Sequence, residues 1–458
     1  MTPVSLMPMA TLLVRNAHVL VTMDGREIPD GGLFIRDGWI ENVGPTHDIP
    51  AVADEIIDLS RHLVMPGLVN THHHLYQTLT RAFPGAQDTG LFQWLRTLYP
   101  VWARMTPDHV RVATRLGLVE LALTGATTAS DHQYLWPNGS GVDDQFEGAD
   151  GLNIRFHAAR GSMSLGESDG GLPPDSVVEA HDQILADTQR VIATHHDASR
   201  GAMRRVVVAP CSPFTVTPEL MRESAALARE AGVRLHTHMA ETNDEEEYCL
   251  ERFGHRPVAY METVDWVGED VWYAHAVHVA DDEVARMGES GTGVAHCPTS
   301  NMRLASGTAP ISRYLDAEVP VGLGVDGSAS NDSSHMLAET RQAFLLNRLA
   351  AAATGADLMT ARDALHLATA GGAAVLGRPD IGILAPGMAA DFVAIDLDRV
   401  EFAGALHDPV AAMVLCSPPR VDHSWVGGRP LVTDGRVAGV DQQALVARHN
   451  LLSRDLAE

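Results

Sequence analysis

The sequence predicts an α/β fold: a (β/α)8 TIM barrel with a small β-sandwich domain formed from both chain ends. Eight short apolar stretches alternate with helical stretches in the middle of the chain, which is the count of such a barrel. The two chain ends instead hold short strands separated by Gly/Asp turns. The 458 residues are enough for a barrel and an accessory domain.

The β domain is predicted to be composite. Residues 1–65 contain the strand-like LLVRNAHVLVT and GGLFIRDGWIENVG, with the turn-rich MDGREIPDG between them. Residues 381–440 return to this texture in MAADFVAIDLD and HSWVGGRPLVTDGRVAGV, and residues 441–458 predict a helical tail. We therefore expect the barrel, residues 66–380, to be inserted into a domain that both ends complete.

The barrel strands are predicted as near-continuous apolar runs, as expected when both faces of a strand are buried. Helices are predicted between them, for example at residues 107–125, 173–196 and 218–232. Barrel enzymes carry their chemistry at the C-terminal ends of the strands, so a site is expected there. The predicted strands are HLVMPGLVNTHHH, ATTASDH, NIRFHAAR, RVVVAPCSP, VRLHTHMAE, VWYAHAVHV, GVAHCPTSN and VPVGLGVDG.

Imidazoles and carboxylates recur at these strand ends. His72 and His74 are two residues apart on strand one and therefore point the same way. Histidine also ends strand five, within His-Thr-His-Met-Ala-Glu (236–241), and strand six carries His275. Asp326 ends strand eight. Because unrelated structural histidines would rarely align at one depth, this recurrence predicts a bound metal ion.

Other residues of these types are predicted to be structural. A lone histidine near a strand end is more often a satisfied core or rim residue than a ligand, which is our interpretation of His157, His278 and His296. The acidic run Asp244 to Glu247 is interpreted as a solvated helix start that the helix dipole favours.

The stretch VGLGVDGSASND contains G-x-G-x-x-G at Gly322, Gly324 and Gly327. A dinucleotide fingerprint requires a strand, a turn, a helix and a second strand that ends in an acidic residue about twenty residues on. Here one helical stretch is followed by another, MTARDALHLATAGGAAVL, without a strand between them. We interpret the glycines as allowing close backbone packing at the barrel end, where Asp326 projects into the mouth.

Bulk composition excludes several partners. A formal net charge of −26 repels nucleic acid backbones and anionic membranes, so neither is an expected partner. We see no secretory signal and no apolar run of membrane-spanning length. The four cysteines are dispersed, which favours free thiols in a reducing cytoplasm. No lysine occurs, which excludes Schiff-base chemistry and any lysine-derived metal bridge.

In their order along the chain, PGLVNTHHH, LHTHMAE, AHAVH and GVDGSASND resemble the amidohydrolase superfamily, in its mononuclear-metal aminohydrolase (deaminase) branch. The missing lysine agrees, because the dinuclear branch usually bridges its metals with a carboxylated lysine. Zinc is the expected ion and Fe(II) the alternative. The resemblance implies the metal ligands His72, His74, His238 and Asp326, and the catalytic residues Glu241, His275 and Asp326.

Longer stretches, such as NTHHHLYQTLTRA and SDHQYLWPNG, are most similar to 8-oxoguanine deaminases. This implies release of ammonia from a purine-like ring, with urate as the product. The alternatives are hydroxylated s-triazine or pterin (isoxanthopterin) aminohydrolases, a ring-amide hydrolase or dechlorinase on the same scaffold, and a catalytically inactive barrel scaffold protein. An H-x-E/P-C-x-x-C deaminase is disfavoured because P-C-x-x-C is absent.

Two residues are candidates for binding the substrate. Gln77, one helical turn beyond His74, offers both an amide donor and an acceptor to a ring edge. Arg160 is suited to pair with a ring oxygen, with a structural salt bridge as the alternative. The expected partners are a small heterocyclic molecule and further copies of the chain in a homo-oligomer.

Overall fold

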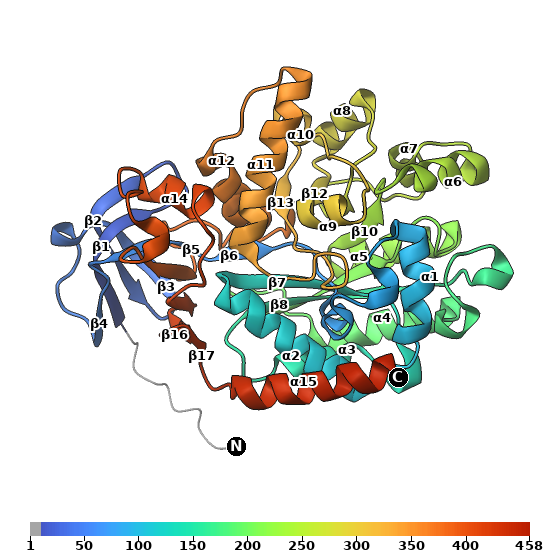
Figure 1. Cartoon of the computed structure of the whole chain (residues 1–458), viewed down its shortest axis with the longest axis horizontal. Helices are drawn as coiled ribbons and strands as arrows, with labels where there is room; N and C mark the ends of the chain where they lie inside the picture. The colour runs from blue at the N-terminus through green and yellow to red at the C-terminus, as the bar shows by residue number, and fades with distance from the viewer. Residues whose placement is uncertain (1–10) are drawn as a thin grey trace.

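The computed structural model describes residues 11–458 and has a closed barrel beside a separate β-sheet (Figure 1). Residues 1–10, the beginning of the predicted N-terminal β segment, lie outside the described residues. The fold class predicted from the sequence, a barrel with a β domain from both chain ends, is confirmed. The boundaries between its parts stay predictions.

Eight parallel strands form the barrel in the order β10-β11-β12-β13-β6-β7-β8-β9. It closes through pairing of β13 with β6, where Leu323 lies opposite Asn70. Each strand corresponds to one of the predicted stretches. They are β6 (Leu68–Asn70), β7 (Ala126–Gln133), β8 (Arg155–Ser162), β9 (Arg204–Pro210), β10 (Leu235–Met239), β11 (Val271–His275), β12 (Gly293–His296) and β13 (Val321–Leu323).

The first predicted strand is divided between the two parts of the molecule. Its beginning, β5 (His62–Pro66), belongs to the β domain, and its end, β6, belongs to the barrel. Gly67 joins them and packs tightly on β7, since a Cβ there would lie 2.1 Å from Oγ1 of Thr127. The strand therefore leaves one sheet and enters the other at a residue without a side chain.

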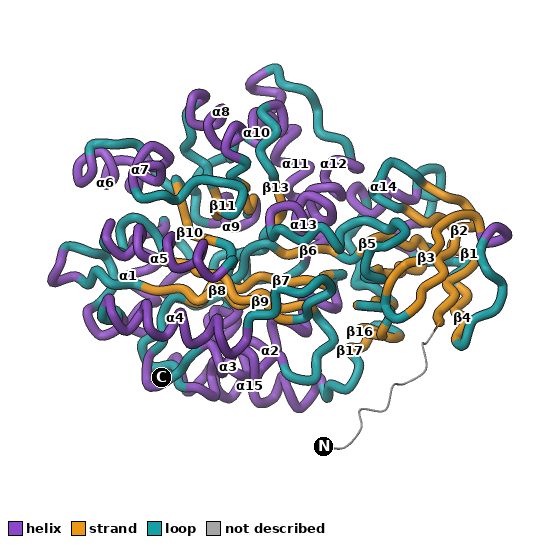
Figure 2. Tube along the Cα trace, turned by 180° about the vertical axis from the view of Figure 1, so that it is seen from behind, coloured by secondary structure: helices purple, strands orange, loops and turns teal. Residues whose placement is uncertain are grey.

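Helices surround the barrel strands and form its outer layer (Figure 2). Helix α15 lies along α2 and returns the C-terminus to the barrel (Figure 1). The helices are α1 (Leu91–Trp102), α2 (Pro107–Leu123), α3 (Val142–Ala149), α4 (His181–His195), α5 (Pro218–Ala231), α6 (Asn243–Phe253), α7 (Pro257–Thr263), α8 (Asp281–Ser290), α9 (Pro298–Arg303), α10 (Ile311–Asp316), α11 (Met336–Thr354), α12 (Ala361–His366), α13 (Gly372–Val375), α14 (Pro409–Leu415) and α15 (Gln442–Ala457).

The β domain is one nine-stranded sheet in the order β17-β16-β15-β14-β5-β1-β2-β3, with β4 paired to β1. Strand β5 lies at its centre between a strand from each chain end: it pairs antiparallel with β14 and parallel with β1. Its remaining strands are β1 (Thr11–Val21), β2 (Glu27–Arg36), β3 (Trp39–Pro45), β4 (Glu55–Asp58), β14 (Phe392–Asp396), β15 (His423–Val426), β16 (Arg429–Thr433) and β17 (Arg436–Val437).

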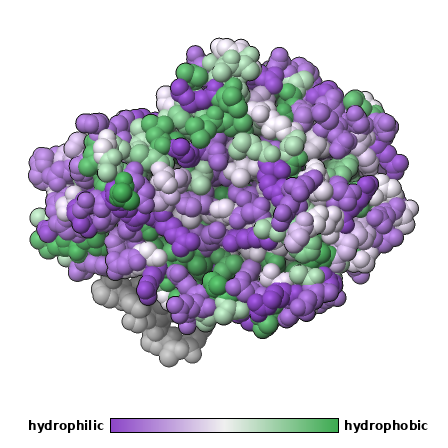
Figure 3. Space-filling model, in the orientation of Figure 1, coloured by the Kyte–Doolittle hydropathy of each residue, from purple (hydrophilic) through white to green (hydrophobic). Residues whose placement is uncertain are grey.

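The surface mixes polar and apolar residues without one dominant apolar area on the face that Figure 3 shows. Among the described helices, none combines the length and the apolar character that crossing a bilayer requires.

A buried ion pair joins the barrel to the β domain. Nε of Arg155, on β8, lies 2.6 Å from Oδ2 of Asp391, and both side chains are at most 2% exposed. The other carboxylate oxygen of Asp391 accepts from Nη2 of Arg155 and from the backbone N–H of Gly427. Removing one member would leave a buried charge without a partner, which destabilises a protein far more than losing an ion pair at the surface.

We predict that Asp391→Ala lowers the free energy of unfolding by about 3–5 kcal/mol, because Arg155 stays buried without its partner. Calorimetric and urea unfolding of the variant would measure the loss. Asp398→Ala is the matched control, because Asp398 is 79% exposed and makes a weak surface pair with Arg61, at 3.7 Å. Equal melting temperatures for the two variants would contradict the prediction.

Candidate metal centre

At the C-terminal mouth of the barrel, two histidine nitrogens lie beside one carboxylate oxygen, and a third histidine nitrogen lies beside one of the two. Oδ1 of Asp326 lies 3.2 Å from Nε2 of His72 and 3.3 Å from Nε2 of His74. The Nε2 atoms of His74 and His238 are 3.1 Å apart. Ligands of a tetrahedral zinc ion, at about 2.0–2.1 Å from it, are about 3.3 Å from one another. The structure thus brings the four predicted ligands close together, and His72 and Asp326 also form a group with His275 that could hold an ion. That these four residues bind the ion stays a prediction.

Backbone carbonyls fix which nitrogen of two of these rings faces the centre. Nδ1 of His74 lies 2.5 Å from the carbonyl oxygen of His132, and Nδ1 of His238 lies 2.7 Å from that of Cys211. A carbonyl only accepts, so each Nδ1 carries the proton and each Nε2 keeps its lone pair. Nε2 of His72 is buried and, among the described residues, contacts only the carboxylate of Asp326, at 3.2 Å. Lone pairs that face one buried point fit a metal ion.

The carboxylate is held by its own loop. Asp326 has φ of 60°, in the left-handed region that few non-glycine residues adopt. The backbone N–H of Gly327 donates to its Oδ1 at 2.6 Å, and Oγ of Ser330 donates to its Oδ2 at 3.2 Å. His275, at the end of β11, also has a left-handed φ, of 72°. Strained backbone of this kind concentrates where a fold presents functional side chains.

Glu241 and His275 stand beside the ligands. Nε2 of His275 lies 3.5 Å from Oε2 of Glu241 and 3.9 Å from Oδ2 of Asp326. Burial raises the pKa of Glu241, and the nearby Asp326 adds to that shift against the opposing effect of His275. Oγ of Ser306 donates to Oε1 of Glu241 at 3.1 Å, and Nδ1 of His275 lies 2.9 Å from Oδ1 of Asn301. This geometry suits proton transfer.

The expectation for the acidic run was wrong at one residue. Glu245 is fully buried, although it lies in the first turn of α6. Its two carboxylate oxygens accept the backbone N–H groups of Ala240 (2.8 Å) and Glu241 (3.0 Å). Burial raises the pKa of Glu245 to about 7. The acidic composition of the helix start did not reveal this burial, because it results from the turn at Ala240 and Glu241, which covers the Glu245 carboxylate.

A cavity opens directly over the centre, and Gln77 lines it together with His74, His238, Glu241, His275 and Asp326. Oε1 of Gln77 is buried without a hydrogen-bond partner in the described chain, so it is free to accept from a bound molecule. The opposite wall is apolar and largely aromatic. Sequence reasoning missed this wall, whose residues come from α1 and from loops: Leu91, Trp94, Leu95, Tyr99, Tyr134, Phe214 and Leu304.

Arg160, the second predicted substrate residue, makes ion pairs instead. Its Nη2 lies 2.6 Å from Oε1 of Glu179 and 3.0 Å from Oδ2 of Asp187. Arg160 is not among the residues that line the cavity. The salt-bridge alternative therefore describes this side chain in the structure.

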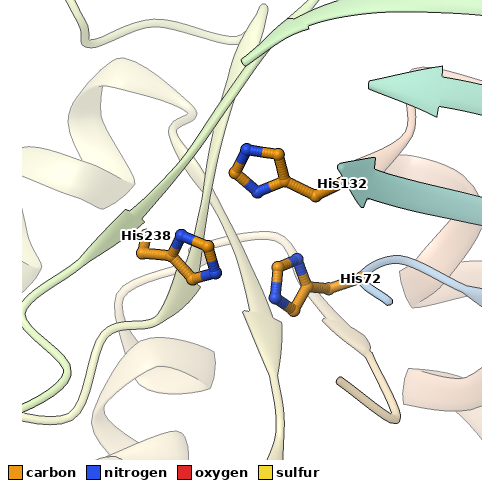
Figure 4. A group of neighbouring side chains, drawn as sticks. All are labelled: His72, His132 and His238. Carbon is orange, nitrogen blue, oxygen red and sulfur yellow. The ribbon is translucent and has the colours of Figure 1, made fainter. Parts of the chain in front are cut away.

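Further histidines adjoin the ligands. The rings of His72, His132 and His238 face one another (Figure 4), and each offers a nitrogen within 4.8 Å of the others. His132 stacks on His238 with ring centroids 4.8 Å apart, while its Nε2 lies 2.9 Å from the carbonyl oxygen of Ala209. Strand two thus ends in a histidine of the cluster, to which sequence reasoning gave no role. Of the histidines predicted to be structural, His278 lies 2.7 Å from the carbonyl oxygen of Ser306.

Comparisons with known proteins show the family of the chain. The family model described as "Amidohydrolase family" matches residues 63–431. The chain is 50% identical to an 8-oxoguanine deaminase from Pseudomonas aeruginosa, covering 96% of this chain and 98% of that protein. It is 38% identical to an isoxanthopterin deaminase from an unknown prokaryotic organism, with 97% of each chain covered. The zinc complex of an atrazine chlorohydrolase from Arthrobacter aurescens superposes with a TM-score of 0.91 at 33% identity, covering 98% and 100% of the two chains.

The glycines of the G-x-G-x-x-G stretch pack against the site. A Cβ at Gly324 would lie 2.7 Å from Cβ of His72 and 3.1 Å from its backbone nitrogen and oxygen. A Cβ at Gly327 would lie 1.9 Å from Oε1 of Gln77. These glycines therefore let the loop that carries Asp326 approach its neighbours, as the sequence indicated.

We predict that Gly324→Ala displaces His72, because the atoms it would meet belong to backbone and Cβ that cannot rotate away. Overpacking of this kind costs about 1–3 kcal/mol. The content of bound divalent metal after dialysis and the melting temperature would both fall. Gly44→Ala is the control, since a Cβ there meets nothing within 4 Å. An unchanged content of bound divalent metal in Gly324→Ala would contradict the prediction.

Proposed function

The chain belongs to the amidohydrolase family, and we propose that it is a metal-dependent aminohydrolase that converts 8-oxoguanine and water to urate and ammonia. One observation carries the proposal: three imidazole nitrogens and a carboxylate oxygen converge at a cavity that also contains Glu241. The identity of 50% to an 8-oxoguanine deaminase over nearly the whole chain supports the choice of substrate. Pterin and hydroxylated s-triazine aminohydrolases are the alternatives. The isoxanthopterin deaminase supports the first, and a 40% identical hydroxydechloroatrazine ethylaminohydrolase from a Pseudomonas strain supports the second.

His72, His74, His238 and Asp326 would hold the ion, for which we propose Zn²⁺, with Fe²⁺ as the alternative. The zinc complex of the structural relative supports zinc, as does the nitrogen-rich donor set. When bound, a divalent ion supplies Lewis acidity, which makes hydroxide available from water near neutral pH.

The chain's own residues then move protons in a balanced sequence. Asp326 takes one proton from the attacking water, and His275 orients the oxygen toward the amino-bearing ring carbon. Glu241, whose pKa is raised by its burial, donates a proton to the adjacent ring nitrogen as the carbon–oxygen bond forms. The carbon–nitrogen bond then breaks, ammonia leaves with the proton from Asp326, and the hydroxyl proton of the intermediate returns to Glu241.

Substrate orientation is assigned to the cavity walls. The unpartnered Oε1 of Gln77 would accept from a ring N–H. The aromatic side chains of Trp94, Tyr134 and Phe214 offer flat apolar surfaces suited to a planar heterocycle. We further propose that the chain assembles as a homo-oligomer and acts in the cytoplasm.

We predict that ammonia release is fastest with 8-oxoguanine in a panel that also contains guanine, isoxanthopterin, hydroxyatrazine and cytosine. A coupled ammonia assay would measure kcat/KM for each ring, and urate would be identified by its absorption. Turnover restricted to the triazine would defeat the assignment of substrate, while leaving the metal-dependent hydrolysis in place.

We predict that Glu241→Gln loses activity and keeps its metal, because the amide preserves the shape of the side chain but supplies no acid. General acid–base catalysis is worth about 10²–10⁴-fold, so kcat should fall by that order. Metal analysis and the ammonia assay would be run on the same sample. Glu247→Gln, an exposed residue of the same acidic run, is the matched control and should retain full activity. An unchanged rate in Glu241→Gln would remove that side chain from the mechanism.

A further inference from the structure

The ligand His72 differs from His74 and His238 in what its Nδ1 contacts. Those two rings face backbone carbonyl oxygens, whereas Nδ1 of His72 lies 2.8 Å from Nε2 of His236. Nδ1 of His236 lies in turn 3.0 Å from the carbonyl oxygen of Trp272. His236 lies on β10, across the barrel from β6 and His72, and its side chain is fully buried.

The protons along this chain have one consistent arrangement. The carbonyl of Trp272 only accepts, so His236 must carry its proton on Nδ1 and keep a lone pair on Nε2. That lone pair requires a proton on Nδ1 of His72, which leaves Nε2 of His72 free to bind a metal. The position of the proton on His72 is thus determined two hydrogen bonds away, by a backbone carbonyl oxygen on β11.

From this geometry we propose that His236 is a positioning residue of the metal centre: it fixes the tautomer and orientation of His72 through a hydrogen bond that no backbone carbonyl supplies. The inference rests on the proposed function only in that the centre binds a divalent ion. It assigns His236 a role through His72, without contact to substrate.

The surroundings hold the His236 ring in this position. Its plane stacks on the indole of Trp272, with centroids 4.5 Å apart and planes at 16°. The indole Nε1 donates to the carbonyl oxygen of Thr71 at 3.2 Å, and Thr71 precedes His72. The contacts that begin at His72 therefore lead through His236 and Trp272 back to the residue before His72. Ring packing and hydrogen bonding constrain the same imidazole, so His236 has no room to rotate its Nε2 away from His72.

A pair of amide variants separates the hydrogen bond from the packing. His236→Gln can place its amide oxygen where Nε2 was, whereas the shorter His236→Asn stops near the position of Nδ1 and leaves His72 without an acceptor. Both replacements are polar and uncharged. The measurement is competition for Zn²⁺ against a chromophoric chelator, with no substrate present, together with the visible spectrum of the Co²⁺-loaded proteins.

Loss of such an outer partner weakens metal affinity by about 10–100-fold. We expect that loss, and a changed Co²⁺ spectrum, for His236→Asn, and near wild-type values for His236→Gln. His157→Gln, at a buried histidine of β8 that pairs with Arg378, is the control and should bind zinc normally. The melting temperatures of the metal-free proteins report any purely structural effect.

Two results would overturn the proposal: zinc affinity unchanged in His236→Asn, or equally weakened in both amide variants, which would assign the effect to ring packing. A wild-type chain that binds zinc but releases no ammonia from 8-oxoguanine would reject the proposed substrate and leave the role of His236 standing. A wild-type chain that binds no divalent ion would reject both.

Discussion

The site depends on a constraint that burial imposes on imidazole: each buried ring needs partners for both of its nitrogens. In His72, His74 and His238, Nδ1 contacts a neighbouring group and Nε2 faces the centre. Two of these neighbours are carbonyls from an adjacent strand, that of His132 on β7 and that of Cys211 after β9. A shift of one residue in strand register would turn these rings to the other face. The geometry of the site therefore depends directly on the register of the barrel strands.

The same mouth holds two carboxyl groups whose pKa values are shifted in opposite directions. Burial opposes the ionisation of Asp326, yet His72, His275 and His74 hold its pKa well below the ordinary value. Burial raises the pKa of Glu241, and Asp326 adds to that shift. Surroundings that push the pKa values of two neighbouring carboxyl groups apart suit one of them to accept a proton and the other to donate one.

Much of this arrangement could be predicted from the sequence, because strand ends in a barrel converge. For that reason four strand-end residues are adjacent in space: His72, His74, His238 and Asp326. The order of the motifs along the chain, through the family resemblance, then predicted them as metal ligands. What escaped prediction lies where the chain crosses between strands. Glu245 sits in an acidic run that composition marks as exposed, and the apolar wall from α1 has no periodic signal that distinguishes a cavity wall from core. Arg160 shows the converse: its partners Glu179 and Asp187 lie 19 and 27 residues away, too far for local spacing to reveal the pairs.

The central position of β5 in the composite sheet bears on how the chain reaches its fold. This strand follows β1 closely in sequence but takes its other neighbour, β14, from more than three hundred residues later. During synthesis, the strands made first therefore expose an unpaired edge until almost the entire polypeptide has emerged. Long-range pairing of this kind is slow and prone to association between chains. We therefore expect the small sheet to assemble late, once the barrel holds the two ends of the molecule near each other.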